Sequence, residues 1–214
     1  MVAALLSAIL ISGCQTVGST DADKPYQSYS GSRSESKYFP VELDNAARAL
    51  GRELANQCAA AGQKSALEAC FRQKTAEAFQ TPDIGLKACQ DVQHFGQYSE
   101  CISIGTIADH LRQKISSAHR PQMIATDWRS PDAYLKNLMK GEILDITDKC
   151  FAGALADVDH CTRTELARFA DVSEHFQQSC ETTKDSEQFG NCLGEALGVQ
   201  FLQQAADRLA AKSA

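Results

Sequence analysis

Apolar residues recur at helical spacing along most of the chain after residue 43. Leu50, Leu54 and Cys58 lie four positions apart. Two further runs keep spacings of three and four: Phe169, Val172, Phe176 and Cys180, and Leu193, Leu197, Phe201, Ala205 and Leu209. Such spacings bring side chains to one face of a helix. No segment alternates apolar and polar residues over enough positions to predict a strand. The pattern therefore predicts an all-α protein of short amphipathic helices, each with one inward face.

Turn and capping signals divide these runs into short helices. Gly62 is a helix stop, and Ser65 with Glu68 has the pattern of a capping box that begins the next helix. Residues 81–83, Thr-Pro-Asp, predict another helix start, with threonine as the N-cap and proline in the first turn. Two further stretches are turn-like: residues 171–174 and residues 182–186.

The N-terminal segment has the pattern of a lipoprotein signal. Residues 1–10 are apolar, but this run is far shorter than the roughly 20 residues that a transmembrane helix needs. Residues 11–13, Ile-Ser-Gly, lead into Cys14, and this stretch resembles the lipobox of bacterial lipoproteins. The resemblance implies that residues 1–13 are a signal peptide and that Cys14 is acylated, palmitate included, as the mature N-terminus. Gln15 rather than aspartate follows the cysteine, which in that family points to the outer membrane.

Residues 14–42 are predicted to form a disordered tether. They are rich in Ser, Gly, Asp and Lys and show no apolar periodicity. A flexible coil of this length has an end-to-end distance of about 25–30 Å. Several acyl chains anchor a protein stably, because each buried CH₂ contributes about 0.8 kcal/mol. We expect the folded part to hang from the periplasmic face of the bacterial outer membrane, held through the lipid.

The cysteines after Cys14 have a regular spacing. Eight remain: Cys58, Cys70, Cys89, Cys101, Cys150, Cys161, Cys180 and Cys192. Adding 91 to 70, 89 and 101 gives 161, 180 and 192, whereas position 58 needs 92 to reach 150. Two tandem copies of one four-cysteine unit explain this period. We assign the copies to residues 43–118 and 132–214, with residues 119–131 as a linker.

An even number of cysteines behind a signal peptide predicts disulfides in an oxidising compartment. Two pairings compete within each copy. Nested pairs would resemble the twin CX9C helical hairpins of mitochondrial intermembrane-space proteins. Neighbour pairs are favoured, because the helix breaks described above lie between the two cysteines of a neighbouring pair. On one continuous helix, two cysteines twelve residues apart would be rotated by about 120° from each other and would not share a face. The predicted bridges are Cys58–Cys70, Cys89–Cys101, Cys150–Cys161 and Cys180–Cys192.

The segment between the copies contains the only tryptophan, Trp128, and an apolar stripe that includes Tyr134, Leu138 and Met139. Such a stripe usually packs into a core, and we expect it to join the two copies. The alternative is a partner-binding surface made by these four residues, because aromatic and methionine side chains are enriched at interfaces.

Signals for catalysis or cofactors are poor. The sequence has no C-x-x-C, no C-x-x-C-H, no G-x-S-x-G and no glycine-rich phosphate loop, so we assign no catalytic residue and no cofactor. The cysteines lack the close thiolate pairs of a zinc site, so no metal ligand is assigned either. A net charge of −6 makes nucleic acid an unexpected partner.

The function expected from these features is a non-catalytic interaction or envelope-assembly module with a protein partner in the envelope. Its architecture is similar to that of small helical lipoproteins that pilot secretin assembly. The alternatives are an enzyme or enzyme inhibitor acting at the cell wall, and a carrier that holds an apolar ligand between its helices.

Overall fold

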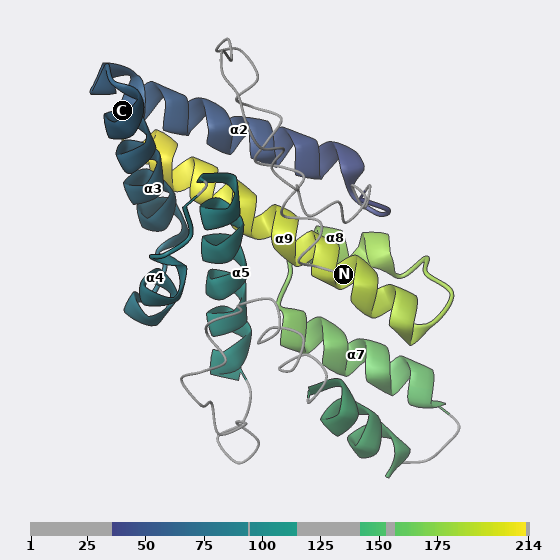
Figure 1. The fold of residues 1–214 in the computed structure, drawn as a ribbon. Coiled ribbons are helices and arrows are strands. Elements are labelled where there is room, and N and C mark those ends of the chain that lie inside the picture. The colour runs from purple at the N-terminus through teal and green to yellow at the C-terminus, as the bar shows by residue number, and fades with distance from the viewer. Residues whose placement is uncertain (1–35, 94, 115–141, 153–156, 213–214) are drawn as a thin grey trace, which may run out of the picture.

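The computed structural model describes residues 36–93, 95–114, 142–152 and 157–212, which are helical and contain no strand (Figure 1). The all-α prediction is confirmed. The helices are α2 (Pro40–Cys58), the 3₁₀ turn η1 (Ala59–Ala61), α3 (Lys64–Phe79), α4 (Asp83–Cys89), α5 (Phe95–Lys114), α7 (Val158–Ala170), α8 (Glu174–Cys180) and α9 (Ser186–Ala211). Residues 142–151 form a further helix beside α7.

The folded body begins before residue 43, where the predicted tether was expected to end. Helix α2 begins at Pro40, and Phe39 before it is only 5% exposed. The ring of Phe39 packs edge-on against Phe176, with centroids 5.0 Å apart. The assignment of residues 36–42 to a disordered tether is therefore wrong, because this aromatic anchor and the proline in the first turn start the helix early.

Two predicted capping signals are also corrected. Helix α3 begins at Lys64 after Gln63 without a side-chain cap, so the box of Ser65 and Glu68 does not form. The Glu68 carboxylate instead accepts a 3.0 Å bond from Arg72, one turn ahead. Helix α4 starts one residue later than predicted, since Pro82 occupies the N-cap position.

The predicted helix breaks are otherwise present. Gly62 has a φ of 63° and ends η1, and this left-handed region suits glycine. Asp171 adopts a φ of 52° at the end of α7, inside the predicted turn. Residues 181–185 form the loop before α9, where the Asp185 carboxylate accepts a 2.8 Å bond from the Gln188 amide.

All four predicted disulfides are confirmed. The bridges are Cys58–Cys70, Cys89–Cys101, Cys150–Cys161 and Cys180–Cys192, with Cα separations of 5.7–5.8 Å. Cys58, Cys89 and Cys180 are the last residues of α2, α4 and α8, and each bonds to a cysteine in the second turn of the next helix. An interval of twelve residues thus spans one turn and the start of a helix.

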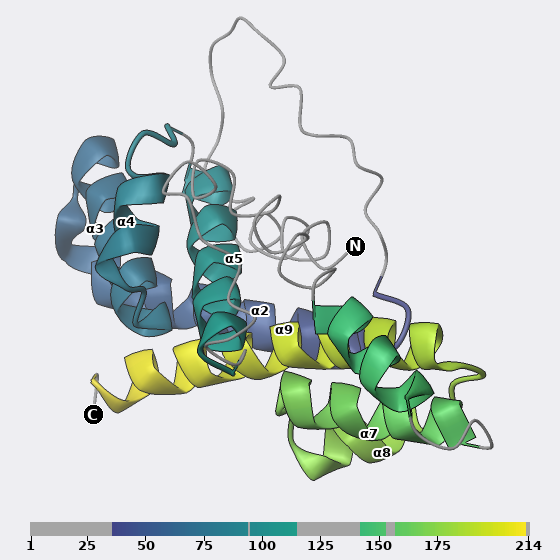
Figure 2. The same cartoon turned by 90° about the horizontal axis from the view of Figure 1, so that it is seen from below.

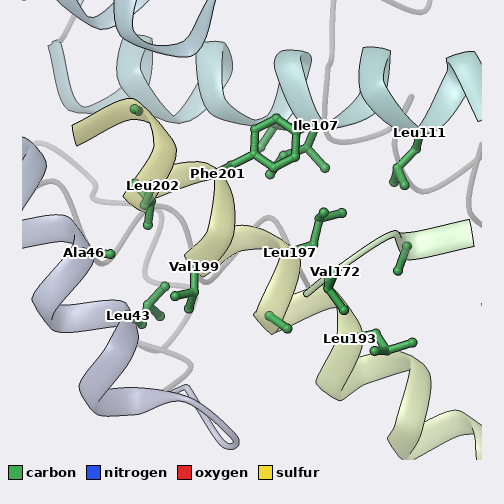
Figure 3. Packing of buried hydrophobic residues seen from close by; sticks show 14 of the residues in the cluster. Leu43, Ala46, Ile107, Leu111, Val172, Leu193, Leu197, Val199, Phe201 and Leu202 are labelled. Atoms are coloured by element: carbon green, nitrogen blue, oxygen red, sulfur yellow. The ribbon is translucent and has the colours of Figure 1, made fainter. Parts of the chain in front are cut away.

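One hydrophobic core runs through both predicted copies. Helix α9 crosses the whole body, with α3, α4 and α5 toward its C-terminal half and α7 and α8 toward its N-terminal half (Figure 2). Helix α2, from the first copy, packs along α9 more extensively than any other pair of labelled helices. In Figure 3, Leu43 of α2 faces Val199 of α9, while Ile107 of α5 lies beside Phe201. The described parts of the segments 43–118 and 132–214 therefore share a single interior.

Helices α5 and α9 are buried on all sides over part of their length, whereas an amphipathic helix keeps one face exposed. Every residue from 101 to 109 in α5 is buried, as is every residue from 195 to 199 in α9. The hydroxyls within the buried part of α5 bond to carbonyls one turn back, Ser103 to Ser99 and Thr106 to Ile102, both at 2.8 Å. These local bonds satisfy the hydroxyls of Ser103 and Thr106, whereas the buried Ser99 hydroxyl has no hydrogen-bond partner among the described residues. The expectation of a single inward face is wrong for both helices, since each has a stretch in which every residue is buried.

In the first half, an arginine ties α3 to the loop between α4 and α5. Arg72 donates a 2.7 Å bond to the Val92 carbonyl, and its guanidinium lies 4.7 Å from the centroid of the Tyr98 ring. Glu68, one turn earlier, holds the same guanidinium. This side chain therefore links two helices and a loop through three kinds of contact.

An arginine 91 positions later makes the same set of contacts in the second half. Arg163 donates a 3.0 Å bond to the Thr183 carbonyl, and its guanidinium lies 5.3 Å from the centroid of the Phe189 ring. Asp159, one turn earlier, bonds to it at 2.7 Å. These contacts agree with the period of 91 seen in the cysteines. That the two halves are copies of one unit stays a prediction from the sequence.

Candidate functional site

The residues proposed from the sequence for lipidation and partner binding lie outside the described residues. This holds for Cys14 and for the four residues of the linker region, Trp128, Tyr134, Leu138 and Met139. The eight other cysteines are all placed, and all of them form bridges.

The helix of residues 142–151 carries the candidate site, an exposed apolar surface. Ile143, Leu144 and Phe151 are 45%, 55% and 54% exposed, and Val41 on α2 is the one other large apolar side chain with comparable exposure in the described part. We call the surface formed by Ile143, Leu144, Phe151 and the partly exposed Thr147 the exposed face. The sequence analysis did not predict this surface, because the apolar stripe assigned there ends at Met139. The available signal was the run Ile-Leu-x-Ile at residues 143–146.

The opposite side of the same helix is fastened to the body. Ile146 and Cys150 are only 4% and 3% exposed, and Cys150 is bonded to Cys161 of α7. The Lys149 ammonium lies 2.8 Å from the Glu165 carboxylate, also on α7. This hydrogen bond with Lys149 lowers the pKa of Glu165, and a second bond, from Arg168, acts in the same direction. The helix is thus held in one orientation.

A groove of about 680 Å³ lies between α7, α8 and the start of α9. His160, Arg163 and Arg168 line it from α7, with Gln177 and Glu181 on the other side. Arg163 is already bound to an aspartate and a loop carbonyl, and Arg168 bonds to a glutamate on its own helix. Both guanidiniums are committed to pairs within the protein, which leaves the groove with the mixed polarity of an ordinary helix surface.

A buried carboxylate receives the N-terminal end of the described chain. Glu195 of α9 is 8% exposed and accepts hydrogen bonds from Ser36 Oγ at 2.7 Å and from the Tyr38 amide at 2.9 Å. The amides of Lys37 and Phe39 add bonds at 3.1 and 3.4 Å. We call this arrangement the Glu195 clamp. It places a carboxylate at the positive end of α2 and fastens residues 36–39 to α9.

A titratable group lies between α5 and α9. The His110 ring packs edge-on against Phe201, with centroids 5.2 Å apart. Burial lowers the pKa of His110 below its usual 6.5. The nearby Lys114 ammonium lowers this pKa further, while the carboxylates of Asp171 and Asp109 oppose the shift. Lys114 also bridges the two halves of the chain through a 2.5 Å ion pair with Asp171.

We expect acidification from about pH 7 to 5 to weaken the fold through this histidine. Because the folded pKa of His110 lies below the unfolded one, the unfolded chain binds more protons in this window, and the free energy of unfolding falls as the pH falls. The substitution His110→Gln should flatten this part of the profile in urea denaturation series. The exposed His175→Gln is the control. An unchanged slope in His110→Gln would contradict the assignment.

The described part of the chain shows no group of three or more His, Cys, Asp or Glu that could hold a metal ion. None of its helices is long and apolar enough to cross a membrane. No protein-family model, curated protein or solved structure matches this chain. The candidate site therefore stands on its own geometry, namely the exposed face beside α7.

Proposed function

We propose that this protein is a periplasmic lipoprotein of the bacterial outer membrane whose disulfide-stabilised helical body is a non-catalytic interaction or envelope-assembly module. The observation that carries the proposal is the pairing of eight of the nine cysteines with one another. Bridges of this number belong to an oxidising compartment. The pairing leaves Cys14 as the one remaining cysteine, directly behind the sequence that resembles a lipobox.

The design of the body supports a scaffold role. Each bridge ties a helix end to the next helix, and in the chain-entropy model a loop of this size contributes about 3 kcal/mol. The Glu195 clamp holds the chain where the segment from Cys14 enters, so the tether ends at a defined point. The described part of this disulfide-bridged body presents an exposed apolar face, which suits the binding of a protein partner.

The substitution Cys14→Ser tests the anchoring. Loss of the acyl chains removes the membrane attachment, so the protein should move from the membrane fraction to the soluble periplasmic fraction. Mass spectrometry of the N-terminal peptide should show an acyl mass on the wild type alone. As a control, the double variant Cys58→Ser/Cys70→Ser should stay in the membrane fraction. Unchanged membrane retention of Cys14→Ser, with no acyl mass on the wild type, would overturn the proposal.

A further inference from the structure

Buried polar atoms without partners gather around α5. In the described part of the chain, three buried side-chain oxygen or nitrogen atoms have no hydrogen-bond partner: Thr75 Oγ1, Ser99 Oγ and His110 Nε2. Ser99 and His110 belong to α5, and Thr75 lies on α3, which packs against α5. Each such atom raises the free energy of the closed structure, because it has lost its hydrogen bonds with water. This cost is thus concentrated at the contacts of one helix.

Thr75 and Ser99 lie at the same level of the interface between α3 and α5. The rings of Phe71 and Phe95 pack with their centroids 5.3 Å apart. Two threonine hydroxyls lie 3.2 Å apart ten and eleven residues farther along the two helical segments, so α3 and α5 run in the same direction. Thr75 and Ser99 each come four residues, about one turn, after the paired rings. We call these two side chains the unpaired hydroxyls.

The second half has no hydroxyl at the corresponding positions. Leu166 and Gly190 come 91 residues after Thr75 and Ser99. Leu166 of α7 packs over Gly190 of α9, since its Cδ1 lies 3.5 Å from the place that a Cβ on this glycine would take. The interface between α7 and α9 is therefore apolar at this level, whereas the one between α3 and α5 closes over two hydroxyls without partners.

Neither disulfide of the first half crosses this interface. Cys58–Cys70 ties α2 to α3, while Cys89–Cys101 ties α4 to α5, so that α4 and α5 form a hairpin closed by its own bridge. Arg72 of α3 links across to the hairpin. On the other side, α5 packs on α9 less extensively than α3 does. His110 places its unpartnered nitrogen on that side, with its ring against Phe201.

We propose that the hairpin of α4 and α5 separates from α3 and α9 as one unit while the other helices stay folded. Burial of apolar side chains such as Ile102 and Ile107 holds the hairpin closed. The three unpartnered atoms offset part of this stabilisation, because each regains hydrogen bonds with water when the hairpin opens. The Cys89–Cys101 bridge keeps the open hairpin in one piece. This conformational change belongs to the body and does not depend on the proposed anchoring or interaction function.

Native-state amide exchange tests the opening. The full-length protein, in detergent and with its disulfides intact, is followed at denaturant concentrations below the global transition. Residues 101–109 should share one opening constant with the protected amides of α4, at least tenfold larger than that of residues 195–199 in α9. The double variant Thr75→Val/Ser99→Ala replaces the unpaired hydroxyls with apolar groups. It should lower the opening constant of the hairpin by about tenfold or more.

Matched variants separate this opening from a general change in stability. Ser103→Ala/Thr106→Val removes two α5 hydroxyls that have partners, so it should not lower the opening constant. Arg72→Ala removes contacts between α3 and the hairpin and should raise the constant several-fold. Arg163→Ala removes the corresponding contacts of the second half. It should lower the global stability and leave the opening constant of the hairpin unchanged.

Three results would each overturn the proposal. The first is one shared opening constant for α4, α5 and α9, because the hairpin would then open only with the whole fold. The second is equal exchange of residues 101–109 in the wild type and in Thr75→Val/Ser99→Ala. The third is an equal effect of Arg72→Ala and Arg163→Ala on the opening constant of the hairpin.

Discussion

Replacing Cys180 and Cys192 together by alanine should lower the free energy of unfolding by about 3 kcal/mol or more. The bridge closes an interval of 12 residues, and the chain-entropy model assigns about 3 kcal/mol to a loop of this size. Both sulfurs also lie in the core, since the two residues are 0% and 1% exposed. Loss of their packing adds to the entropic effect. Urea denaturation of the wild type and the variant measures the difference.

The bridge between Cys58 and Cys70 provides the matched control. It closes an interval of the same 12 residues, but Cys70 is partly exposed. The double alanine variant should therefore lose the entropic contribution and less of the packing. Hydrogen exchange should show faster opening around residues 180–192 in the first variant, with α2 and α3 still protected. A smaller loss for the buried bridge than for Cys58–Cys70 would contradict this account.

The substitution Glu195→Ala should lower the free energy of unfolding by about 2–4 kcal/mol. It removes the acceptor for Ser36 Oγ and for three successive backbone amides, in a site where the carboxylate is 8% exposed. Unpaired buried donors cost about 1–3 kcal/mol, and bonds to charged groups are the stronger ones. Glu195→Gln should cost less, because its amide keeps one acceptor oxygen.

Two readouts separate the Glu195 clamp from a general loss of stability. Amide exchange at Tyr38 and Phe39, and proteolysis near residue 38, should accelerate in Glu195→Ala at denaturant concentrations where the core is intact. The substitution Asp185→Ala removes an exposed N-cap on the same helix and should cost about 1 kcal/mol without exposing this segment. If residues 36–39 stay protected in Glu195→Ala, the clamp does not hold the start of α2.

The helix-ending signals and the disulfides were predictable because both are local. Gly62 ends η1 with a positive φ of 63°, a conformation that glycine adopts because it lacks a side chain. An interval of twelve residues around such a break brings two cysteines together after a single turn. The period of 91 repeated this arrangement further along the chain and strengthened the prediction. The capping box does not form because α3 begins one residue before Ser65, which places Ser65 inside the helix, and Glu68 pairs with Arg72 instead.

Long-range contacts account for what sequence reasoning missed. The Glu195 clamp joins residues about 156–159 positions apart, and a glutamate in the middle of a helix gives no local sign of such a role. The complete burial of residues 101–109 likewise follows from α5 having neighbours on several sides. The spacing of apolar residues shows which of them share a face of a helix. It does not show on how many sides other helices will pack against that helix.

The residues of the chain by themselves determined the all-α class, most helix breaks and the four bridges, since these depend on backbone conformation and on spacings of about a dozen residues. The tertiary structure decided that α2 packs on α9, that both halves share one core, and that Ile143, Leu144 and Phe151 stay exposed. The physical reason is that apolar stripes are chemically alike. Many pairings of such stripes bury similar areas, and shape complementarity over the whole molecule selects one.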